Sequence, residues 1–478
     1  MSAGDSKFGL EISKGVTAKF VMAAIGFVGS VVFARVLGAS GYGSFYIITT
    51  LVNVLDNPVT GWGNACKKRI TETDFPTSEA LGAGLISAIV LPCIIIPLVY
   101  ASQVYTDLYN ISGLVLPFSI LFIAICIFAV TNRILSGRYN FSAANWADTL
   151  RSLFTTPLQL VFVSIGWGVA GMVYGLALAT ALTIPYVIYK IGIKPSRPSR
   201  SSLASIVSYA KYSVPSGFVG STMSRVDILL LGAFLSSSAV GVYQVSVQLT
   251  MAGLFIGGVA QAGLMGRVSN NWSKNNKKQI VDDVTNSLGY VSVLSIPIFF
   301  GTVAMPNDLL VTIFGSEYSG VGSILISLAL FTVLKTQSTQ LRSTVAGIDR
   351  PDIITVIKTT ALILNVGIGY LLLIEYGIIG VVIATIFSQG LQYISFAYIT
   401  KQYLPEISLF PNSLQYQLLS GIIMFALVKY AHTLMDITWW GEIAFLIGLG
   451  GFTYFTILSV ISKSFRATVQ GILSDIDI

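Results

Sequence analysis

Charged residues are scarce in this chain of 478 residues. Only 10% are Asp, Glu, Lys or Arg, against roughly 25% in an average soluble domain. At the same time, 54% of the residues are hydrophobic. This composition excludes a water-soluble fold and predicts an all-α integral membrane protein.

Histidine and cysteine are also rare. The single histidine, His432, is too little for a multi-histidine metal site. The three cysteines, Cys66, Cys93 and Cys126, lack the spacing of metal ligands, and two of them lie within apolar runs. We therefore expect buried thiols that pack as small apolar side chains, with neither a metal nor another cofactor.

Two motifs are missing as well, a cleavable signal peptide and a nucleotide-binding glycine loop. The first apolar run, Val16 to Leu37, is longer than the roughly 7 to 15 residues of a signal-peptide core, so we expect it to remain as the first helix. No glycine loop followed by Lys and Ser or Thr is present, so nucleotide hydrolysis is not expected to drive the protein. Any pumping would use an ion gradient, of Na⁺ or H⁺, or downhill removal of the product.

Long apolar runs dominate what remains. A bilayer core about 30 Å thick needs roughly 20 mostly apolar residues per helix. The sequence accordingly predicts about fourteen transmembrane helices. Their approximate bounds are 12–37, 42–65, 79–102, 111–133, 143–165, 169–190, 204–234, 238–265, 283–305, 320–344, 353–374, 377–400, 413–434 and 440–462.

Basic residues flank these spans almost entirely on one side. The even-numbered connections carry Lys67, Lys68, Arg69, Arg133, Arg138, Lys190, Lys194, Arg197, Arg200, Arg267, Lys274, Lys277, Lys278, Arg350 and Lys401. The odd-numbered connections carry almost none beyond Arg35. By the positive-inside rule, both termini are predicted to be cytoplasmic in a multi-pass protein of the cytoplasmic membrane. The formal charge of +7 is thus a matter of topology, and no nucleic-acid partner is expected.

The connection 191–203 is rich in Ser, Pro and basic residues and divides the first twelve helices into two sets of six. The sequence therefore predicts an N-terminal lobe over 1–190, a cytoplasmic linker over 191–203, a second lobe over 204–400, and two further helices with a tail over 401–478. The halves resemble each other weakly. Gly-Ser-Phe at 43–45 corresponds to Gly-Val-Tyr at 241–243, and the glycine pair at 168–171 to that at 377–380. Duplicated bundles are common in transporters.

Several spans contain charges, which cost about 2.5 to 3.5 kcal/mol each at mid-bilayer and so face a cavity or a partner. Many fall on one helical face. The second helix carries Thr49, Asn53, Asp56 and Thr60, and the fifth carries Asp148, Arg151, Thr155 and Gln159. The seventh carries Lys211, Ser221, Arg225 and Asp227, and the tenth carries Lys335, Ser338, Thr339 and Arg342.

These stripes predict a water-filled cavity between two six-helix lobes, with more cations than acids. We expect its substrate-binding residues to be Asp56, Arg151, Lys211, Arg225 and Lys335. Such a lining suits a phosphate-bearing substrate, because Arg binds phosphate oxygens bidentately and Lys acts as a point charge. Alternatively, the charges are local pairs that fix helix packing, such as Asp148 with Arg151 or Arg225 with Asp227.

Four stretches of sequence carry a family resemblance. They are FARVLGASGYGSFYIITTL at 33–51, VPSGFVGSTMSRVDILLLGAFLSSSAVGVY at 214–243, LLVTIFGSEYSGVG at 309–322 and STVAGIDRPDI at 343–353. Together they resemble polysaccharide flippases, the O-antigen translocase (Wzx) branch of the multidrug/oligosaccharidyl-lipid/polysaccharide exporter superfamily. The resemblance implies two six-helix lobes around a positively charged central cavity, with helices thirteen and fourteen added. It also implies alternating access that moves a polyprenyl-phosphate- or pyrophosphate-linked oligosaccharide outward, with membrane lipids and other glycan-assembly proteins as partners.

Two alternatives remain. A cation-coupled multidrug exporter of the same superfamily would usually have twelve helices and acidic cavity residues, which the predicted fourteen helices and basic lining disfavour. A membrane glycosyltransferase or polymerase would usually display a large outer loop, but the longest one here, 306–319, offers only Asp308 and Glu317. The Asp-Ile-Asp sequence at 475–477 resembles a metal-binding motif but has no domain around it. We therefore do not expect an enzyme.

Overall fold

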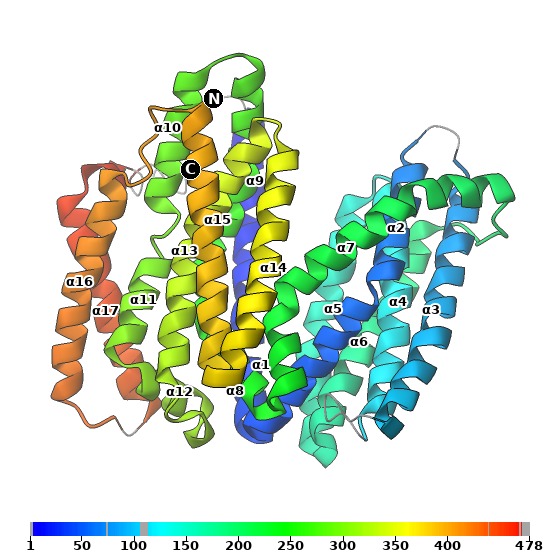
Figure 1. The fold of residues 1–478 in the computed structure, drawn as a ribbon, viewed down its shortest axis with the longest axis horizontal. Coiled ribbons are helices and arrows are strands. Elements are labelled where there is room, and N and C mark those ends of the chain that lie inside the picture. The colour runs from blue at the N-terminus through cyan, green and yellow to red at the C-terminus, as the bar shows by residue number, and fades with distance from the viewer. Residues whose placement is uncertain (1–2, 73–74, 106–112, 438, 468–469, 471–478) are drawn as a thin grey trace. The chain divides into compact units, whose positions relative to one another are not determined.

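The computed structural model of the chain describes residues 3–72, 75–105, 113–437, 439–467 and 470. The Asp475–Ile–Asp477 motif lies outside these residues. All regular secondary structure in the described part is helical (Figure 1), which confirms the predicted fold class. By packing, the chain divides into two units, 1–241 and 242–478.

The membrane-spanning helices correspond to the predicted ones. Twelve helical segments are long and apolar enough to cross a bilayer. One of them, Phe141–Ile191, contains the two spans predicted at 143–165 and 169–190, with a turn at Gly166, where φ is +92°. Another, Ala24–Leu55, turns at Gly38, where φ is +68°, and covers parts of the spans predicted at 12–37 and 42–65. Such positive φ angles favour glycine, since a Cβ atom would clash there. The span predicted at 42–65 is interrupted after Leu55 and continues in α2 (Asn57–Ile70). The described residues thus hold twelve candidate membrane-spanning segments, close to the approximate count of fourteen predicted from the sequence.

The first unit is built from helices of the N-terminal half. Their bounds are α1 Ala3–Leu55, α2 Asn57–Ile70, α3 Thr77–Tyr105, α4 Val115–Gly137, α5 Phe141–Phe162, a π-turn Val163–Trp167, α6 Gly168–Ile191 and α7 Arg200–Phe234. Helix α2 packs against both α4 and α7, and α6 packs against α4 and α5. Because α7 packs on α2, the division by packing falls one helix later than the division expected at the 191–203 linker.

Close glycine packing joins the start of α8 (Ser237–Thr250) to the second part of α1. A Cβ atom on Gly43 would lie 1.7 Å from the carbonyl oxygen of Ser237, and one on Gly241 would lie 2.0 Å from that of Ala39. Each glycine thus faces the carbonyl four residues before the other. The two positions that correspond in the sequence repeat, 43 and 241, meet in one reciprocal contact, which small residues at helix crossings allow.

The second unit contains the remaining helices. Their bounds are a 3₁₀ turn Met251–Leu254, α9 Phe255–Ser273, α10 Lys277–Tyr290, α11 Ser295–Ala304, α12 Pro306–Phe314, a 3₁₀ turn Ser316–Tyr318, α13 Gly322–Gly347, α14 Pro351–Tyr376, α15 Ile378–Tyr403, α16 Asn412–Thr433 and α17 Trp440–Ile461. Helix α13 packs against α9, α11 and α15. A core of mostly Leu, Ile and Val side chains, which also includes Phe396, packs α9, α10, α13 and α15 together near the α9–α10 turn.

Two buried glutamines stabilise the break between α10 and α11. Gln337 on α13 donates to the backbone oxygen of Leu288 at 3.0 Å, and Gln417 on α16 donates to that of Gly289 at 2.5 Å. A helix end leaves its last carbonyls without intrahelical partners, and such groups are costly to bury unpaired. The glutamine side chains therefore supply the donors that the interrupted helix lacks.

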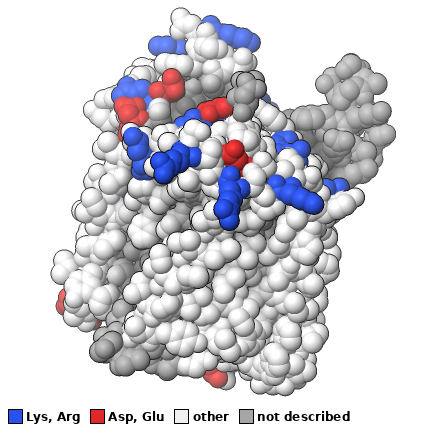
Figure 2. Space-filling model, turned by 90° about the vertical axis from the view of Figure 1, so that its right-hand side faces the viewer, with Lys and Arg blue, Asp and Glu red and all other residues white. Residues whose placement is uncertain are grey.

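Charged residues are unevenly distributed over the surface (Figure 2). On the face drawn in Figure 2, Lys and Arg gather at one end, above a broad band of uncharged residues. The apolar band and the long helices make this a multi-pass membrane protein.

Candidate functional site: a polar cavity within the first unit

A cavity of about 500 Å³ opens within the first unit between α1, α2, α4, α5 and α7. Most of its lining is polar, in contrast to the apolar band outside. The lining residues are Asn53, Asp56, Asn57, Thr60, Lys67, Ile125, Phe128, Ala129, Asn132, Arg133, Ser136, Phe141, Ala144, Asn145, Asp148, Arg151, Ser221 and Arg225.

The break between α1 and α2 forms one wall. Pro58 has no backbone N–H, so the carbonyl of Val54 loses its helical donor. The side-chain amide of Asn57 replaces it, donating to Val54 at 3.1 Å and to Asn53 at 2.7 Å. Asp56 is 8% exposed and accepts a hydrogen bond from the Thr60 hydroxyl at 3.1 Å. The proline thus places a buried carboxylate at the break, at the edge of the cavity.

Helices α4 and α5 form the opposite wall. On α5, Nη2 of Arg151 lies 3.6 Å from Oδ1 of Asp148. The Asn132 amide on α4 donates to the other oxygen of Asp148 at 3.2 Å. The Arg151 guanidinium also lies over the ring of Phe128, with its Cζ atom 4.7 Å from the ring centre. The local ion pair considered from the sequence is therefore present, and it lies in the lining of the cavity.

Helix α7 contributes Arg225 and closes the third side. Its hydroxyl groups bond to the wall that carries Asp56: Ser221 donates to the backbone oxygen of Asn53 at 3.0 Å, and Ser213 donates to that of Gly61 at 2.8 Å. Arg225 follows Ser221 by four residues and so shares its face. The two hydrogen bonds hold α7 in the register that brings Arg225 to the cavity.

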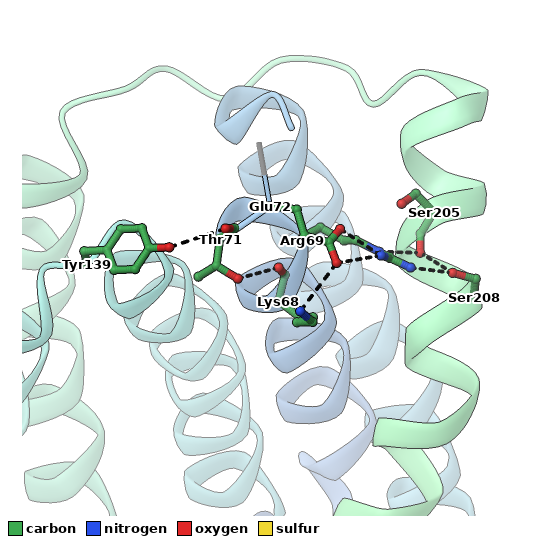
Figure 3. Close-up of polar contacts among 7 residues, drawn as sticks. All are labelled: Lys68, Arg69, Thr71, Glu72, Tyr139, Ser205 and Ser208. Carbon is green, nitrogen blue, oxygen red and sulfur yellow. Dashed lines mark hydrogen bonds and ion pairs between the residues drawn. The ribbon is translucent and has the colours of Figure 1, made fainter. Parts of the chain in front are cut away.

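The last turn of α2 holds three consecutive basic residues with different surroundings. Lys67 lines the cavity, with Nζ 5.2 Å from the centre of the Phe141 ring. Arg69 points away toward α7, where it donates to the backbone oxygen of Ser205 at 3.0 Å and to the hydroxyl of Ser208 at 2.7 Å (Figure 3).

The same Arg69 guanidinium donates two hydrogen bonds to the Glu72 carboxylate, at 2.8 and 3.0 Å (Figure 3). These bonds favour the charged carboxylate and hold the pKa of Glu72 below its ordinary value. Nζ of Lys68 lies 3.6 Å from the same carboxylate. Of the three basic residues, Lys67 is therefore the one whose charge faces the cavity.

The lining is net positive. Four cations, Lys67, Arg133, Arg151 and Arg225, face two carboxylates, Asp56 and Asp148, which leaves a balance of +2. Arg133, Arg151 and Arg225 all interact electrostatically with the Asp56 carboxylate. A cluster of this sign in a cleft of low dielectric concentrates anions.

Other residues predicted for the site lie elsewhere. Lys211 is exposed on α7, with Nζ 4.9 Å from the Tyr212 ring centre, and it does not line this cavity. Asp227 is half-buried on α7, also outside the lining. Lys335 and Arg342 belong to α13 in the second unit, where Lys335 is exposed and its Nζ lies 5.3 Å from the Phe331 ring centre. The structure thus brings Asp56, Arg151 and Arg225 together in one cavity.

Sequence reasoning missed the contribution of α4. Asn132 and Arg133 line the cavity, although the positive-inside rule assigns Arg133 only to the end of a span. A signal was present, because Ala129, Arg133 and Ser136 follow one another at helical spacing on one face. Lys67 was likewise assigned to topology alone.

The histidine and the three cysteines, which the sequence does not predict to bind a metal, lie in different environments. Cys66 and Cys126 are buried, as predicted, whereas Cys93 is exposed on the apolar surface of α3. His432 lies 2.9 Å from Asp308 through Nε2 and Oδ2. Within the described part of the chain, no three His, Cys, Asp or Glu residues gather in a way that would hold a metal ion.

A polar cavity among membrane-spanning helices is typical of membrane transporters, whose substrate pathways are lined by charged residues. Residues 32–323, more than half of the chain, match the family model described as "Polysaccharide biosynthesis protein". The chain belongs to this family.

Two curated relatives come from Haloferax volcanii. The chain is 25% identical over 453 residues to "Probable low-salt glycan biosynthesis flippase Agl15", covering 93% of this chain and 94% of that protein. It is 24% identical over 478 residues to "Probable flippase AglR", covering 98% of each.

Solved structures agree on the fold. "Lipid II flippase MurJ, inward closed conformation" matches with a TM-score of 0.74 at 14% identity, over 94% of this chain and 99% of that one. An "Inward-facing conformation of a multidrug resistance MATE family transporter of the MOP superfamily" matches with a TM-score of 0.60 at 18% identity, over 81% and 96%. Together with the family and the curated relatives, this fold confirms the prediction that the protein is a transporter. It supports transport rather than covalent catalysis.

Proposed function

We propose that this protein is a flippase that moves a polyprenyl-phosphate- or pyrophosphate-linked oligosaccharide across the cytoplasmic membrane by alternating access. The transported unit serves the assembly of a surface polysaccharide or another glycoconjugate. The observation that carries the proposal is the net positive, largely polar cavity among membrane-spanning helices, in a chain of the polysaccharide biosynthesis family. The curated relatives, which are named as flippases, support it.

The chemistry of the lining fits both ends of such a head group. Arg151 and Arg225 offer planar guanidinium groups that bind phosphate oxygens bidentately, and Lys67 adds a point charge. Asn145 and the amide oxygens of Asn53 and Asn57 also line the cavity and can bond to sugar hydroxyls. The lipid tail stays in the apolar surroundings that it already occupies.

Asp56 would limit how tightly the anion is held. An acid among three arginines offsets part of their charge, so that the phosphate binds strongly enough to enter and weakly enough to leave. Lys211, exposed on α7 of the first unit, and Lys335, on α13 of the second unit, are proposed to meet the same head group at another stage of transport. We also propose that a gradient of Na⁺ or H⁺ drives the transport. Both termini of the chain are proposed to lie in the cytoplasm.

A multidrug exporter is the alternative that a specific observation favours. The fold is shared with a MATE family transporter, and the cavity contains the acidic residue Asp56. A cationic drug, however, would meet four cations in the lining and only two carboxylates. The balance of charge therefore favours the anionic lipid-linked substrate.

A paired assay on one deletion strain distinguishes the two functions. We expect loss of surface glycan, accumulation of the lipid-linked precursor on the cytoplasmic leaflet, and unchanged ethidium retention. Complementation with the wild-type gene should restore the glycan. Intact surface glycan together with raised ethidium retention would reject the flippase and establish the exporter.

A further inference from the structure

Among the cations that line the cavity, Arg151 lies beside both a carboxylate and an aromatic ring. Phe128 and Asn132 lie four residues apart on α4 and so share one face, which is turned to α5. Asp148 and Arg151 lie three residues apart on α5 and face them. The result is a chain of contacts in which Asn132 bonds to Asp148, Asp148 pairs with Arg151, and Arg151 lies over the Phe128 ring.

Each contact restricts the guanidinium in a different way. The Phe128 ring lies against the guanidinium, with Cζ 4.7 Å from the ring centre, and limits its movement on that side. The Asp148 carboxylate holds one edge through Nη2, at 3.6 Å. Asn132 in turn donates to the other carboxylate oxygen of Asp148, which favours the orientation in which only Oδ1 is turned to Arg151. The remaining N–H groups of Arg151 stay available to a ligand in the cavity.

We propose that Phe128, Asn132 and Asp148 are positioning residues, which pre-orient Arg151 for bidentate binding of the phosphate group of the substrate. This inference rests on the proposed function, because it assigns a role within the same cavity. A long arginine side chain normally loses rotamer freedom when it binds an anion, and a guanidinium already fixed on two sides loses less. The three residues thereby raise affinity without contacting the phosphate.

The test measures binding of fluorescent polyprenyl pyrophosphate to the purified full-length protein in lipid nanodiscs. Phe128→Leu removes the ring while keeping an apolar side chain, and we expect binding about 3- to 10-fold weaker, the range of a partly desolvated cation–π contact. Asn132→Leu removes the donor to Asp148 and should weaken binding in the same direction. The matched control is Phe122→Leu on the same helix, where the ring is buried, stacks on Phe118 and does not line the cavity.

The decisive comparison repeats Phe128→Leu and Asn132→Leu in an Arg151→Gln background. If the two residues act through Arg151, both substitutions lose their effect on affinity there, whereas a general loosening of the bundle would persist. Equal weakening in the two backgrounds, or no weakening in either, would overturn the inference. The proposed site is tested separately by Arg151→Gln alone: unchanged binding in that variant would reject the anion site itself, whereas weakened binding with silent Phe128 and Asn132 variants would reject only their positioning role.

Discussion

The reciprocal contact between Gly43 and Gly241 gives a sharp prediction about stability. In protein structures a Cβ atom essentially never approaches a non-bonded heavy atom closer than 3.0 Å. Gly43→Ala would place its Cβ 1.7 Å from the carbonyl oxygen of Ser237, so the two backbones must separate by at least 1.3 Å, the difference between 3.0 and 1.7. Because the obstacle is backbone, no side-chain rotation relieves it. Overpacking of this kind costs roughly 1 to 3 kcal/mol.

Gly220→Ala is the matched control. Gly220 lies within α7, and a Cβ atom there would meet nothing within 4 Å. Both substitutions remove the same backbone freedom from the unfolded chain, so the difference between them isolates the clash. We expect Gly43→Ala to unfold at a lower SDS fraction in mixed micelles than Gly220→Ala. The corresponding difference in the free energy of unfolding should be about 1 to 3 kcal/mol. Equal stability of the two variants would refute the close crossing and the reciprocal contact on which it rests.

Three further predictions follow from the site and the topology. Single cysteines at the exposed positions Ser196 and Ser316, in a chain without native cysteines, should react differently with an impermeant thiol reagent on intact cells: only 316 should be labelled, and labelling of 196 alone would reverse the proposed orientation. Neutralising Arg225 or Lys335 to Gln should reduce transport while membrane abundance on immunoblots stays the same; wild-type transport in both variants would leave these charges with packing roles only. Gln417→Leu should lower stability toward SDS by about 1 to 3 kcal/mol, because the Gly289 carbonyl loses its buried donor, and unchanged stability would exclude that role.

The apolar runs determined most of what could be predicted about the fold. Within a bilayer a helix satisfies the hydrogen bonds of its own backbone, so each span is one continuous apolar helix. Length and hydropathy are therefore enough to place the spans approximately. The merging of two pairs of spans was less predictable. Whether the chain turns at Gly38 within a continuous helix, or in a separate loop, depends on backbone angles that hydropathy does not specify.

The residues of the cavity were predictable where polar side chains form a stripe on one helix. They were less predictable where the packing of neighbouring helices determines which face is turned to the cavity. Asp56 and Arg151 follow from such stripes, and both line the cavity. On α7, however, the serines that bond to the neighbouring wall select the inward face. Lys211 precedes Ser213 by two residues and so points about 200° away from the hydroxyl that bonds to Gly61, and it lies 14 residues, or about 21 Å along the helix, from Arg225. The contribution of α4 depends in the same way on which face packs toward α5, which the sequence of α4 alone does not determine.

The most direct test of the account measures flipping by the purified protein in proteoliposomes. The substrate is a polyprenyl-pyrophosphate-linked oligosaccharide, and the signal is the loss of lectin-accessible sugar from the leaflet to which it was added. We predict that the wild-type protein moves this lipid, that Arg151→Gln combined with Arg225→Gln does not, and that neither moves the same glycan on an uncharged lipid alcohol. Flipping of the charged lipid by the double variant at the wild-type rate, or equal flipping of the charged and uncharged lipids, would contradict the claim that the cationic cavity selects an anionic lipid-linked glycan.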